Sequence, residues 1–593
     1  MIGFVDIATK EEDATQYGLL HPRPSVAERV RSNARVAAAA LLPLALVAWA
    51  VVQVSSSAAV PLAPLAATVA KAAPLTTEAP PQQWFGVSLG GWLVMEINPA
   101  QRQSNSPMDL RPNWMFDQIF ASSELDFVTE LRRDRGDAFA IATMRNHWAG
   151  YYTGEQLDAA KALGVDTVRI PVGYWIMDAP EGGSSPLEYG ISPEGFVTGG
   201  LNHLLAMLKM LKQRGMGALV DIHAMPCNSA CVSDGLYCAH PLAFMAKGEA
   251  PIGDMERCGA AGGGVYPTTR KPREGEMEWP DVGVNAVGAL AAWVAALPEE
   301  AASVVCFQLA NEPALGPSSV EVYAAILAFY QRAMRAARQH LPTLPLVLSF
   351  MGPTPEVREF LTKSDADDRA VGGGGNIGDH HYYSNWQACC AVGPGVPAIN
   401  QMPWDEIHRR ACLLEAEGDA HDIDKYGQAG LQVIVGEWSL ATNMDAPMDL
   451  TNAEARPPHS VYPACPPAHL PARPPAQTWC RRRPRCPLQT RRQLTQFYRE
   501  QLETFSKRKE IRGSFFWTLR MGSGWDPRPS EGYPHGRQLD GSSAWKSLHG
   551  YPFTFWSMLE MATVGVITPL NGDYTGTCAK NRCQGPLGTC DLS

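Results

Sequence analysis

The chain has 593 residues, and charged residues make up 19% of it, with a formal net charge of -10. This acidic balance argues against a nucleic-acid partner, because phosphate-binding proteins carry basic surfaces. The length exceeds one ordinary domain, but α/β barrels commonly run beyond about 250 residues as one unit. One catalytic domain with appended segments therefore fits the length.

The first informative segment is the apolar stretch 36–54, which is long enough to span a bilayer. Arginines between residues 29 and 35 precede it, and no basic residue follows until Lys71, so the basic side is expected to stay cytoplasmic. We predict a cytoplasmic tail at 1–35, a transmembrane signal anchor at 36–54 and an Ala/Pro-rich stalk at 55–83. The protein is then a single-pass type II membrane protein whose catalytic domain is extracellular or lumenal. A cleaved signal peptide, which would release a secreted protein, is the alternative.

Eight short apolar runs in the rest of the chain are typical of buried strands, and most of them end in a polar or aromatic residue. They lie at 84–89, 167–171, 218–223, 304–310, 346–349, 377–382, 431–435 and 511–517. Helical spacing of apolar residues occurs between them, at 154–163, 199–214, 283–296, 320–340 and 491–509. Strands that alternate with helices predict a parallel sheet of the α/β class, and eight repeats predict a (β/α)8 TIM barrel over residues 84–563.

Two glutamates follow predicted strands at positions 125 residues apart, Glu312 in Asn311-Glu312-Pro313 and Glu437 in Gly436-Glu437-Trp438. The C-terminal ends of barrel strands meet at one rim, so the two carboxylates are expected to lie close together. Retaining glycosidases need two carboxyl groups about 5 Å apart, one as proton donor and one as nucleophile. The pair therefore predicts a glycoside hydrolase.

Seven motifs in order resemble glycoside hydrolase family 5, and within it the fungal-type exo-β-1,3-glucanases (glucan 1,3-β-glucosidases). The resemblance covers roughly residues 84–563 and strengthens the barrel assignment. The motifs are Gly86-Val87-Ser88-Leu89-Gly90-Gly91-Trp92-Leu93-Val94-Met95-Glu96, Arg169-Ile170-Pro171-Val172-Gly173-Tyr174-Trp175, Asp221-Ile222-His223, Asn311-Glu312-Pro313, Asp379-His380-His381-Tyr382, Gly436-Glu437-Trp438-Ser439 and Phe516-Trp517-Thr518.

The resemblance implies catalytic roles for two residues and substrate binding for seven more. Glu312 resembles the general acid/base and Glu437 the nucleophile of an enzyme that releases glucose from the non-reducing ends of β-glucan. It implies that Arg169 keeps the nucleophile ionised and that Asn311 binds the sugar 2-hydroxyl. Neither a metal ion nor an organic cofactor is implied. The residues expected to bind substrate are Glu96, Arg169, His223, Asn311, His380, Tyr382 and Trp517.

Each of these assignments has an alternative. The same barrel family includes endo-β-1,4-glucanases and β-glucan transglycosylases, and a catalytically idle glucan-binding surface protein would keep the barrel. Arg169 also fits a structural ion pair, and His223 also fits a core histidine. Trp517 and Trp438 are candidates for core packing, which we favour for Trp438.

Three segments depart from a plain barrel. Residues 224–281 form a long loop that contains four of the 14 cysteines, and residues 564–593 form a tail with three more, so disulfides are expected. A zinc site is the alternative for the loop. Residues 446–492 are rich in Pro and Arg, which is typical of a disordered surface insertion.

Overall fold

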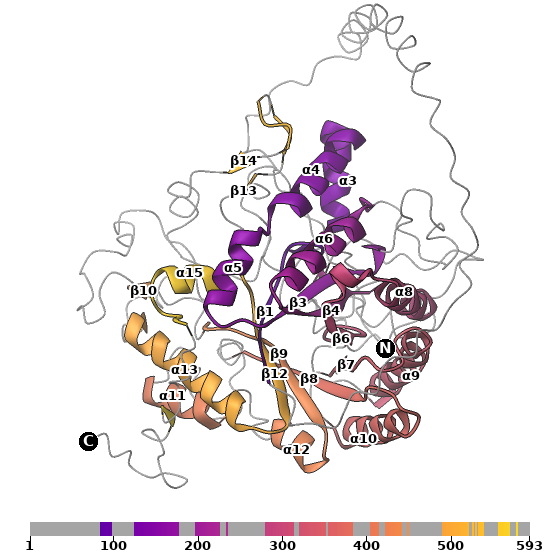
Figure 1. The fold of residues 1–593 in the computed structure, drawn as a ribbon, viewed down its shortest axis with the longest axis vertical. Coiled ribbons are helices and arrows are strands. Elements are labelled where there is room, and N and C mark those ends of the chain that lie inside the picture. The colour runs from indigo at the N-terminus through magenta and orange to yellow at the C-terminus, as the bar shows by residue number, and fades with distance from the viewer. Residues whose placement is uncertain are drawn as a thin grey trace, which may run out of the picture. The chain divides into compact units, whose positions relative to one another are not determined.

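The eight predicted strands form one closed parallel barrel in the computed structural model (Figure 1). The fold is thus the predicted (β/α)8 type. The structure describes residues 83–97, 124–176, 196–225, 233–234, 279–313, 320–350, 354–383, 404–413, 422–441, 448–449, 489–520, 525–526, 528–530, 532–535, 537–538, 556–569 and 577–578.

The barrel strands lie within a few residues of their predicted positions. Around the barrel the order is β1-β12-β9-β8-β7-β6-β4-β3, with every neighbouring pair parallel. Their bounds are β1 (Trp84–Ser88), β3 (Thr167–Gly173), β4 (Gly217–Ala224), β6 (Val304–Gln308), β7 (Leu346–Ser349), β8 (Asn376–Tyr382), β9 (Gln432–Trp438) and β12 (Ile511–Phe516).

Helices follow most strands, and all five predicted helices are present among them. Threonine side chains cap two helices: Thr153 forms a capping box with Gln156 at the start of α5, and Thr354 caps α10 ahead of Pro355. The helices are α3 (Glu124–Arg135), α4 (Asp137–Gly150), α5 (Gly154–Ala162), α6 (Gly200–Gln213), α8 (Trp279–Ala295), α9 (Val320–Arg338), α10 (Pro355–Ala370), α11 (Trp404–Leu413), α12 (Asp422–Gln428), α13 (Arg491–Lys507) and α15 (Met558–Thr563).

Shorter elements complete the described part of the chain. They are the 3-10 turns η3 (Tyr174–Ile176) and η7 (Glu299–Ala301), and the two-residue strands β2 (Glu96–Ile97), β5 (Ser233–Asp234), β10 (Met448–Asp449), β11 (Gln489–Thr490), β13 (Trp525–Asp526) and β14 (Arg537–Gln538). Strand β10 pairs with β11, so the two ends of the Pro/Arg-rich segment lie side by side. The residues between these strands lie outside the described part.

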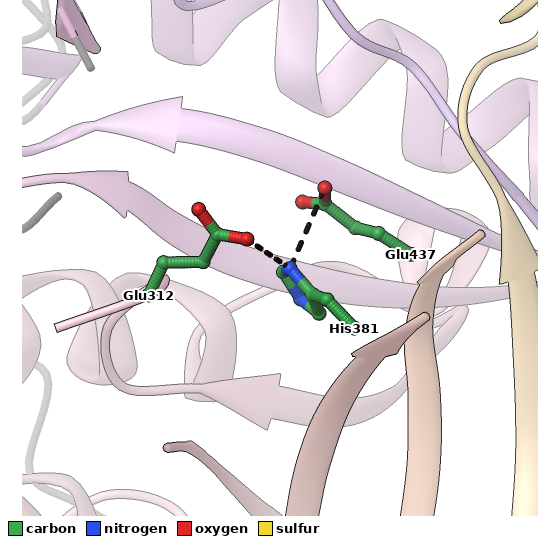
Figure 2. A group of neighbouring side chains, drawn as sticks. All are labelled: Glu312, His381 and Glu437. Carbon is green, nitrogen blue, oxygen red and sulfur yellow. Dashed lines mark hydrogen bonds and ion pairs between the residues drawn. The ribbon is translucent and has the colours of Figure 1, made fainter. Parts of the chain in front are cut away.

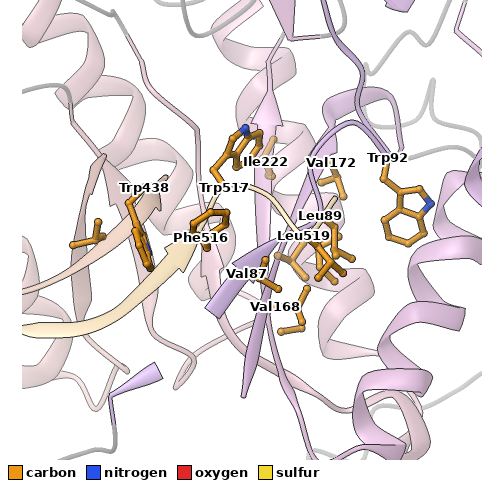
Figure 3. Packing of buried hydrophobic residues seen from close by; sticks show 14 of the residues in the cluster. Val87, Leu89, Trp92, Val168, Val172, Ile222, Trp438, Phe516, Trp517 and Leu519 are labelled. Carbon is orange, nitrogen blue, oxygen red and sulfur yellow. The ribbon is translucent and has the colours of Figure 1, made fainter. Parts of the chain in front are cut away.

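The strands contribute to two hydrophobic clusters, one on each face of the barrel sheet. Alternate residues of the barrel belong to the large hydrophobic cluster that also contains the apolar helix faces, as Figure 3 shows around Val87, Val168 and Phe516. The residues of opposite parity form a second, smaller cluster. Its buried members are Leu219, Cys306, Val347, Ile377, Ile434 and Phe515.

A polar layer lies two residues further along four of the strands that supply this smaller cluster. Asp221, Gln308, Ser349 and Asp379 follow Leu219, Cys306, Val347 and Ile377 with the same parity, and all four polar side chains are buried. The barrel interior therefore changes from apolar to polar toward the C-terminal ends of the strands. This is the end at which active sites of such barrels are built.

A disulfide joins helix α11 to the C-terminal tail, between Cys412 and Cys578, which are 166 residues apart in sequence. The backbone N–H of Cys578 donates to the buried carboxylate of Glu503 on α13, at 2.8 Å. The tail is thus attached to two neighbouring helices. This pairing agrees with the expected disulfides.

Replacing Cys412 and Cys578 together with serine is expected to lower the free energy of unfolding by about 2–5 kcal/mol, because the cross-link no longer restricts the unfolded chain. Thermal unfolding of the single and double variants measures the loss. The two single variants should lose as much as the double variant, since either one breaks the bond. Additive losses would show that the two sulfurs stabilise the protein separately.

Several predicted segments lie outside the described residues. These include the predicted cytoplasmic tail, membrane anchor and most of the stalk, the cysteine-containing loop beyond its ends, and the interior of the Pro/Arg-rich segment. Among the residues that the structure does describe, no helix has both the length and the apolar character needed to cross a bilayer.

Candidate active site

Glu437, near the end of β9, is held by a guanidinium and a phenol. Arg169 of β3 donates to its Oε1 at 2.7 Å, and the hydroxyl of Tyr383, which directly follows β8, donates to its Oε2 at 2.6 Å. Both Glu437 and Arg169 are buried. Charge-assisted bonds of this kind favour the ionised carboxylate that a nucleophile requires.

Arg169 also binds three further groups of the polar layer. It donates to Asn311 Oδ1 at 2.8 Å and to Gln308 Oε1 at 3.1 Å, and its Nη2 lies 3.0 Å from Asp221 Oδ2. Burial opposes the positive charge, but the negative charges of Asp221 and Glu437 outweigh this effect and raise the pKa of Arg169 above its usual value. The guanidinium is therefore a permanent charge that joins strands β3, β4, β6 and β9.

His223 at the end of β4 lies between Asp221 and Asn311. Its Nδ1 lies 2.7 Å from Asp221 Oδ2, and its Nε2 lies 3.4 Å from Asn311 Nδ2. Because a carboxylate accepts and an amide NH2 donates, His223 carries its proton on Nδ1 and accepts with Nε2. The Asn311 amide is then oriented from both ends, by Arg169 at its oxygen and His223 at its nitrogen.

Glu312 follows Asn311 in the segment after β6 and has an unusual backbone. Its φ is +38°, the single positive value among the described non-glycine residues. This left-handed conformation is unfavourable for a side chain with a Cβ atom, and such strain is typical of functional positions. The backbone N–H of Glu312 donates to Ser349 Oγ of β7 at 3.3 Å.

The imidazole of His381 lies between the two glutamates (Figure 2). Its Nδ1 is 2.5 Å from Glu312 Oε1 and 3.5 Å from Glu437 Oε2. The three groups have oxygen and nitrogen atoms within 4.8 Å of one another. The two carboxylates are thus separated by the spacing of a retaining glycosidase, in which one group attacks directly, and not by the wider spacing of an inverting one.

Charge balance explains why a histidine fits between two acids. Burial opposes protonation of His381, but the negative charges of Glu437, Asp379 and Glu312 outweigh it and raise its pKa well above 6.5. An imidazolium between the carboxylates reduces their mutual repulsion.

The same three side chains, Glu312, His381 and Glu437, are spaced closely enough to hold a metal ion. However, their ligand atoms already have protein partners, since Arg169 and Tyr383 donate to Glu437 and His381 bonds to Glu312. The guanidinium of Arg169 would also repel a cation. We therefore interpret the group as a pair of carboxyl groups bound by protein hydrogen-bond partners, and not as a metal site.

A family model described as Cellulase (glycosyl hydrolase family 5) matches residues 133–456, which include both glutamates. The chain belongs to glycosyl hydrolase family 5. This is the family that the motifs resemble.

Curated relatives of this family-5 chain cover a smaller region. A glucan 1,3-beta-glucosidase of Candida oleophila is 30% identical over 145 residues, which are 24% of this chain and 29% of the relative. A glucan 1,3-beta-glucosidase of Blumeria graminis is 28% identical over 149 residues, 24% of this chain and 29% of the relative. The aligned region thus spans less than a third of either relative. Among solved structures, rutinosidase from Aspergillus niger matches with a TM-score of 0.48 and 14% identity, covering 82% of this chain and 98% of that one.

The structure brings together five of the predicted site residues of this family-5 enzyme, from four different strands or strand ends: Arg169, His223, Asn311, Glu312 and Glu437. Trp517 directly follows β12 and lies beside them. Its ring stacks on His223 with centroids 5.4 Å apart, and the Arg169 guanidinium lies 5.7 Å from its centroid. Trp517 is therefore part of the cluster.

On β8 and just after it, the described contacts with the two glutamates come from His381 and Tyr383, the residues next to the predicted His380 and Tyr382. Successive residues of a strand point to opposite faces, and in β8 Asp379 and His381 point into the barrel, followed by Tyr383. The intervening residues have the opposite parity, and the ring of Tyr382 packs against Phe505 of α13. His381 and Tyr383 occupy the positions that the prediction gave to His380 and Tyr382.

The segment after β1 leads to Glu96, whose side chain lies outside the described residues. Three side chains form hydrogen bonds to the Gly90-Gly91 turn before it. Thr518 Oγ1 accepts from Gly90 N at 2.8 Å, Tyr152 donates to Gly90 O at 2.9 Å, and His147 donates to Gly91 O at 2.9 Å. Burial lowers the pKa of His147 to about 4, so it makes this bond as a neutral donor.

Trp438 packs in the core, which is the role that we favoured for it from the sequence. It is fully buried, stacks on Tyr498 of α13 and meets Phe505 and Phe516 edge to face. Its indole points away from Glu437 because consecutive strand residues alternate. Gln308, Asp221 and Asp379 were not predicted as site residues. Asp221 has the strand parity of the predicted His223, whereas Asp379 has the parity of His381.

Proposed function

We propose that this family-5 enzyme is a retaining exo-β-1,3-glucanase that releases glucose from the non-reducing ends of β-glucan. The spacing of Glu312 and Glu437, whose oxygens lie within 4.8 Å together with His381, carries the retaining mechanism. The glucan 1,3-beta-glucosidases of Candida oleophila and Blumeria graminis support the linkage.

The proposed reaction is a double displacement. Glu437 attacks the anomeric carbon while Glu312 donates a proton to the glycosidic oxygen, so the bond to the leaving sugar breaks and a covalent glycosyl-enzyme forms. Glu312 then removes a proton from water, which attacks the same carbon and releases Glu437. The sugar leaves with the β configuration that it had in the glucan.

The surrounding residues have proposed roles in this reaction. Arg169 and Tyr383 occupy one oxygen each of Glu437 and keep it ionised and oriented. The Nδ2 group of Asn311 has a second hydrogen that is available for the sugar 2-hydroxyl, a contact that strengthens in the transition state. Trp517 and Glu96 are proposed to bind the terminal glucose.

We also propose that the catalytic domain works outside the cytosol, either on the predicted membrane anchor at residues 36–54 or as a secreted protein. The disulfide between Cys412 and Cys578 supports this location, because structural disulfides are rare in reducing compartments.

Proton NMR of the first products from laminarin tests the proposed function. We expect β-glucose as the first product, before it mutarotates, and no release of longer oligosaccharides. The α anomer would contradict the retaining mechanism, and long oligosaccharides from laminarin or from cellulose oligomers would favour an endo-acting glucanase. Longer transfer products would indicate a transglycosylase, and an inactive wild-type protein would favour a glucan-binding role.

A further inference from the structure

We propose that Asp379, a buried carboxylate below the two glutamates, is a positioning residue that determines which nitrogen of His381 bears a proton and so keeps Glu312 able to donate one. This inference rests on the proposed function, because it concerns how the general acid of that reaction holds its proton. Its support is the hydrogen-bond arrangement around Asp379.

Three N–H groups converge on the two oxygens of Asp379. The backbone of Gly436 donates to Oδ1 at 2.9 Å, while Gln308 Nε2 donates to Oδ2 at 2.8 Å and His381 Nε2 lies 3.1 Å from the same oxygen. The approach to Gly436 is so close that a Cβ atom there would lie 2.1 Å from Oδ1. A glycine is therefore required immediately before Glu437.

Asp379 must be ionised to accept from all three donors. Burial opposes its negative charge, but His381 and Arg169 outweigh this effect and hold the pKa of Asp379 below its usual 3.8. An ionised Asp379 can only accept, so Nε2 of His381 keeps its hydrogen whether the ring is neutral or charged. Only Nδ1 of His381 is left to gain or lose a proton.

The bond between His381 Nδ1 and Glu312 Oε1, 2.5 Å long, then holds one proton. The proton is either on the ring, facing a carboxylate, or on Glu312, facing a neutral ring. In passing from the first state to the second, an N–H bond breaks and an O–H bond forms, and nothing else is required. The titratable groups that face the ring are Glu312, Glu437 of β9 and Asp379 itself, with Arg169 of β3 bonded to Glu437.

An asparagine at position 379 would disturb this arrangement in a defined way. It offers one acceptor oxygen and one NH2 group to three donors. The backbone N–H of Gly436 cannot change, so the amide oxygen should face Gly436 and the NH2 should face His381. Nε2 must then accept, the hydrogen moves to Nδ1, and Glu312 is forced to accept as a carboxylate. In this state Glu312 has no proton to donate.

The test compares two β-glucosides, an alkyl glucoside that needs a proton donor and a dinitrophenyl glucoside that does not. For Asp379→Asn, kcat/KM on the alkyl glucoside should fall about 10²-fold, the size of a general-acid contribution, and that on the dinitrophenyl glucoside should fall less than about tenfold. The basic limb of the pH profile should move to lower pH, because His381 loses a negative neighbour.

Glu500→Gln is the matched control. Glu500 of α13 is also a fully buried carboxylate paired with a histidine, His408 of α11, at 2.6 Å, but it lies among the outer helices. Its kinetics on both glucosides should remain those of the wild type. If Asp379→Asn loses equally on both substrates, or loses nothing, the proposal is overturned.

A second measurement needs no variant at position 379. In the full-length wild-type protein with 15N-labelled histidine, the His381 signal, recognised by its loss in His381→Gln, should show a protonated Nε2 at every pH at which the protein is folded. A neutral ring protonated on Nδ1 would overturn the proposal. This result is independent of turnover, whereas a wild-type protein that hydrolyses neither glucoside would instead refute the proposed function.

Discussion

Replacing Glu437 with glutamine is expected to reduce kcat/KM on every β-glucoside by at least about 10⁴-fold, comparable to the loss of a nucleophile in other covalent enzymes. A neutral amide cannot form the glycosyl-enzyme, whatever the leaving group. The fold should persist, because Arg169 keeps Asp221, Asn311 and Gln308 as partners. Steady-state kinetics and thermal unfolding measure the two effects separately.

Azide distinguishes loss of the nucleophile from a general loss of structure. In Glu437→Ala, azide can enter the space left by the carboxylate and attack a dinitrophenyl β-glucoside, so the C–O bond breaks and an N–C bond forms with inversion. The product should be the α-glucosyl azide. A β-glucosyl azide would show that another group still forms the covalent intermediate, and Glu437 would not be the nucleophile.

Replacing Glu312 with glutamine should affect substrates according to their leaving groups. We expect kcat/KM to fall about 10²–10⁴-fold on laminarin and alkyl β-glucosides, which need protonation of the departing oxygen. On dinitrophenyl β-glucoside the first step should continue, while kcat falls because water is no longer deprotonated. A burst of dinitrophenol followed by slow turnover is the expected time course.

Glu312→Ala with azide completes the comparison with Glu437→Ala. Here azide should attack the glycosyl-enzyme from the face that Glu312 leaves open, which gives the β-glucosyl azide after two inversions. Equal losses on laminarin and on dinitrophenyl β-glucoside would show that Glu312 is not the proton donor. In that case His381, which lies 2.5 Å from Glu312, would be the next group to test.

The fold and much of the site were predictable because each depends on a local pattern. Apolar runs that end in a polar residue predicted the strands. Because parallel strands end at one rim, Arg169, Asn311 and Glu437 could be placed together there without predicting how the helices pack. The anchor at residues 36–54 stays a prediction, since it lies outside the described part of the chain.

The choice between neighbouring residues of β8 was not predictable in the same way. Its residues are buried or half-buried along the whole strand, so no alternation of polar and apolar residues shows which parity faces the barrel interior. The side-chain contacts with β9, from Asp379 to Gly436 and from His381 to Glu437, show which residues face the interior. Nor could the partner of Cys412 be chosen among 14 cysteines.

The left-handed backbone of Glu312 has a consequence for how this enzyme can be improved. A residue without a Cβ atom would have no strain there, so the backbone alone favours glycine at a position where the proposed mechanism requires an acid. Selection for heat resistance alone would therefore tend to remove the proposed proton donor, and engineering for durability has to keep this position fixed while it improves others.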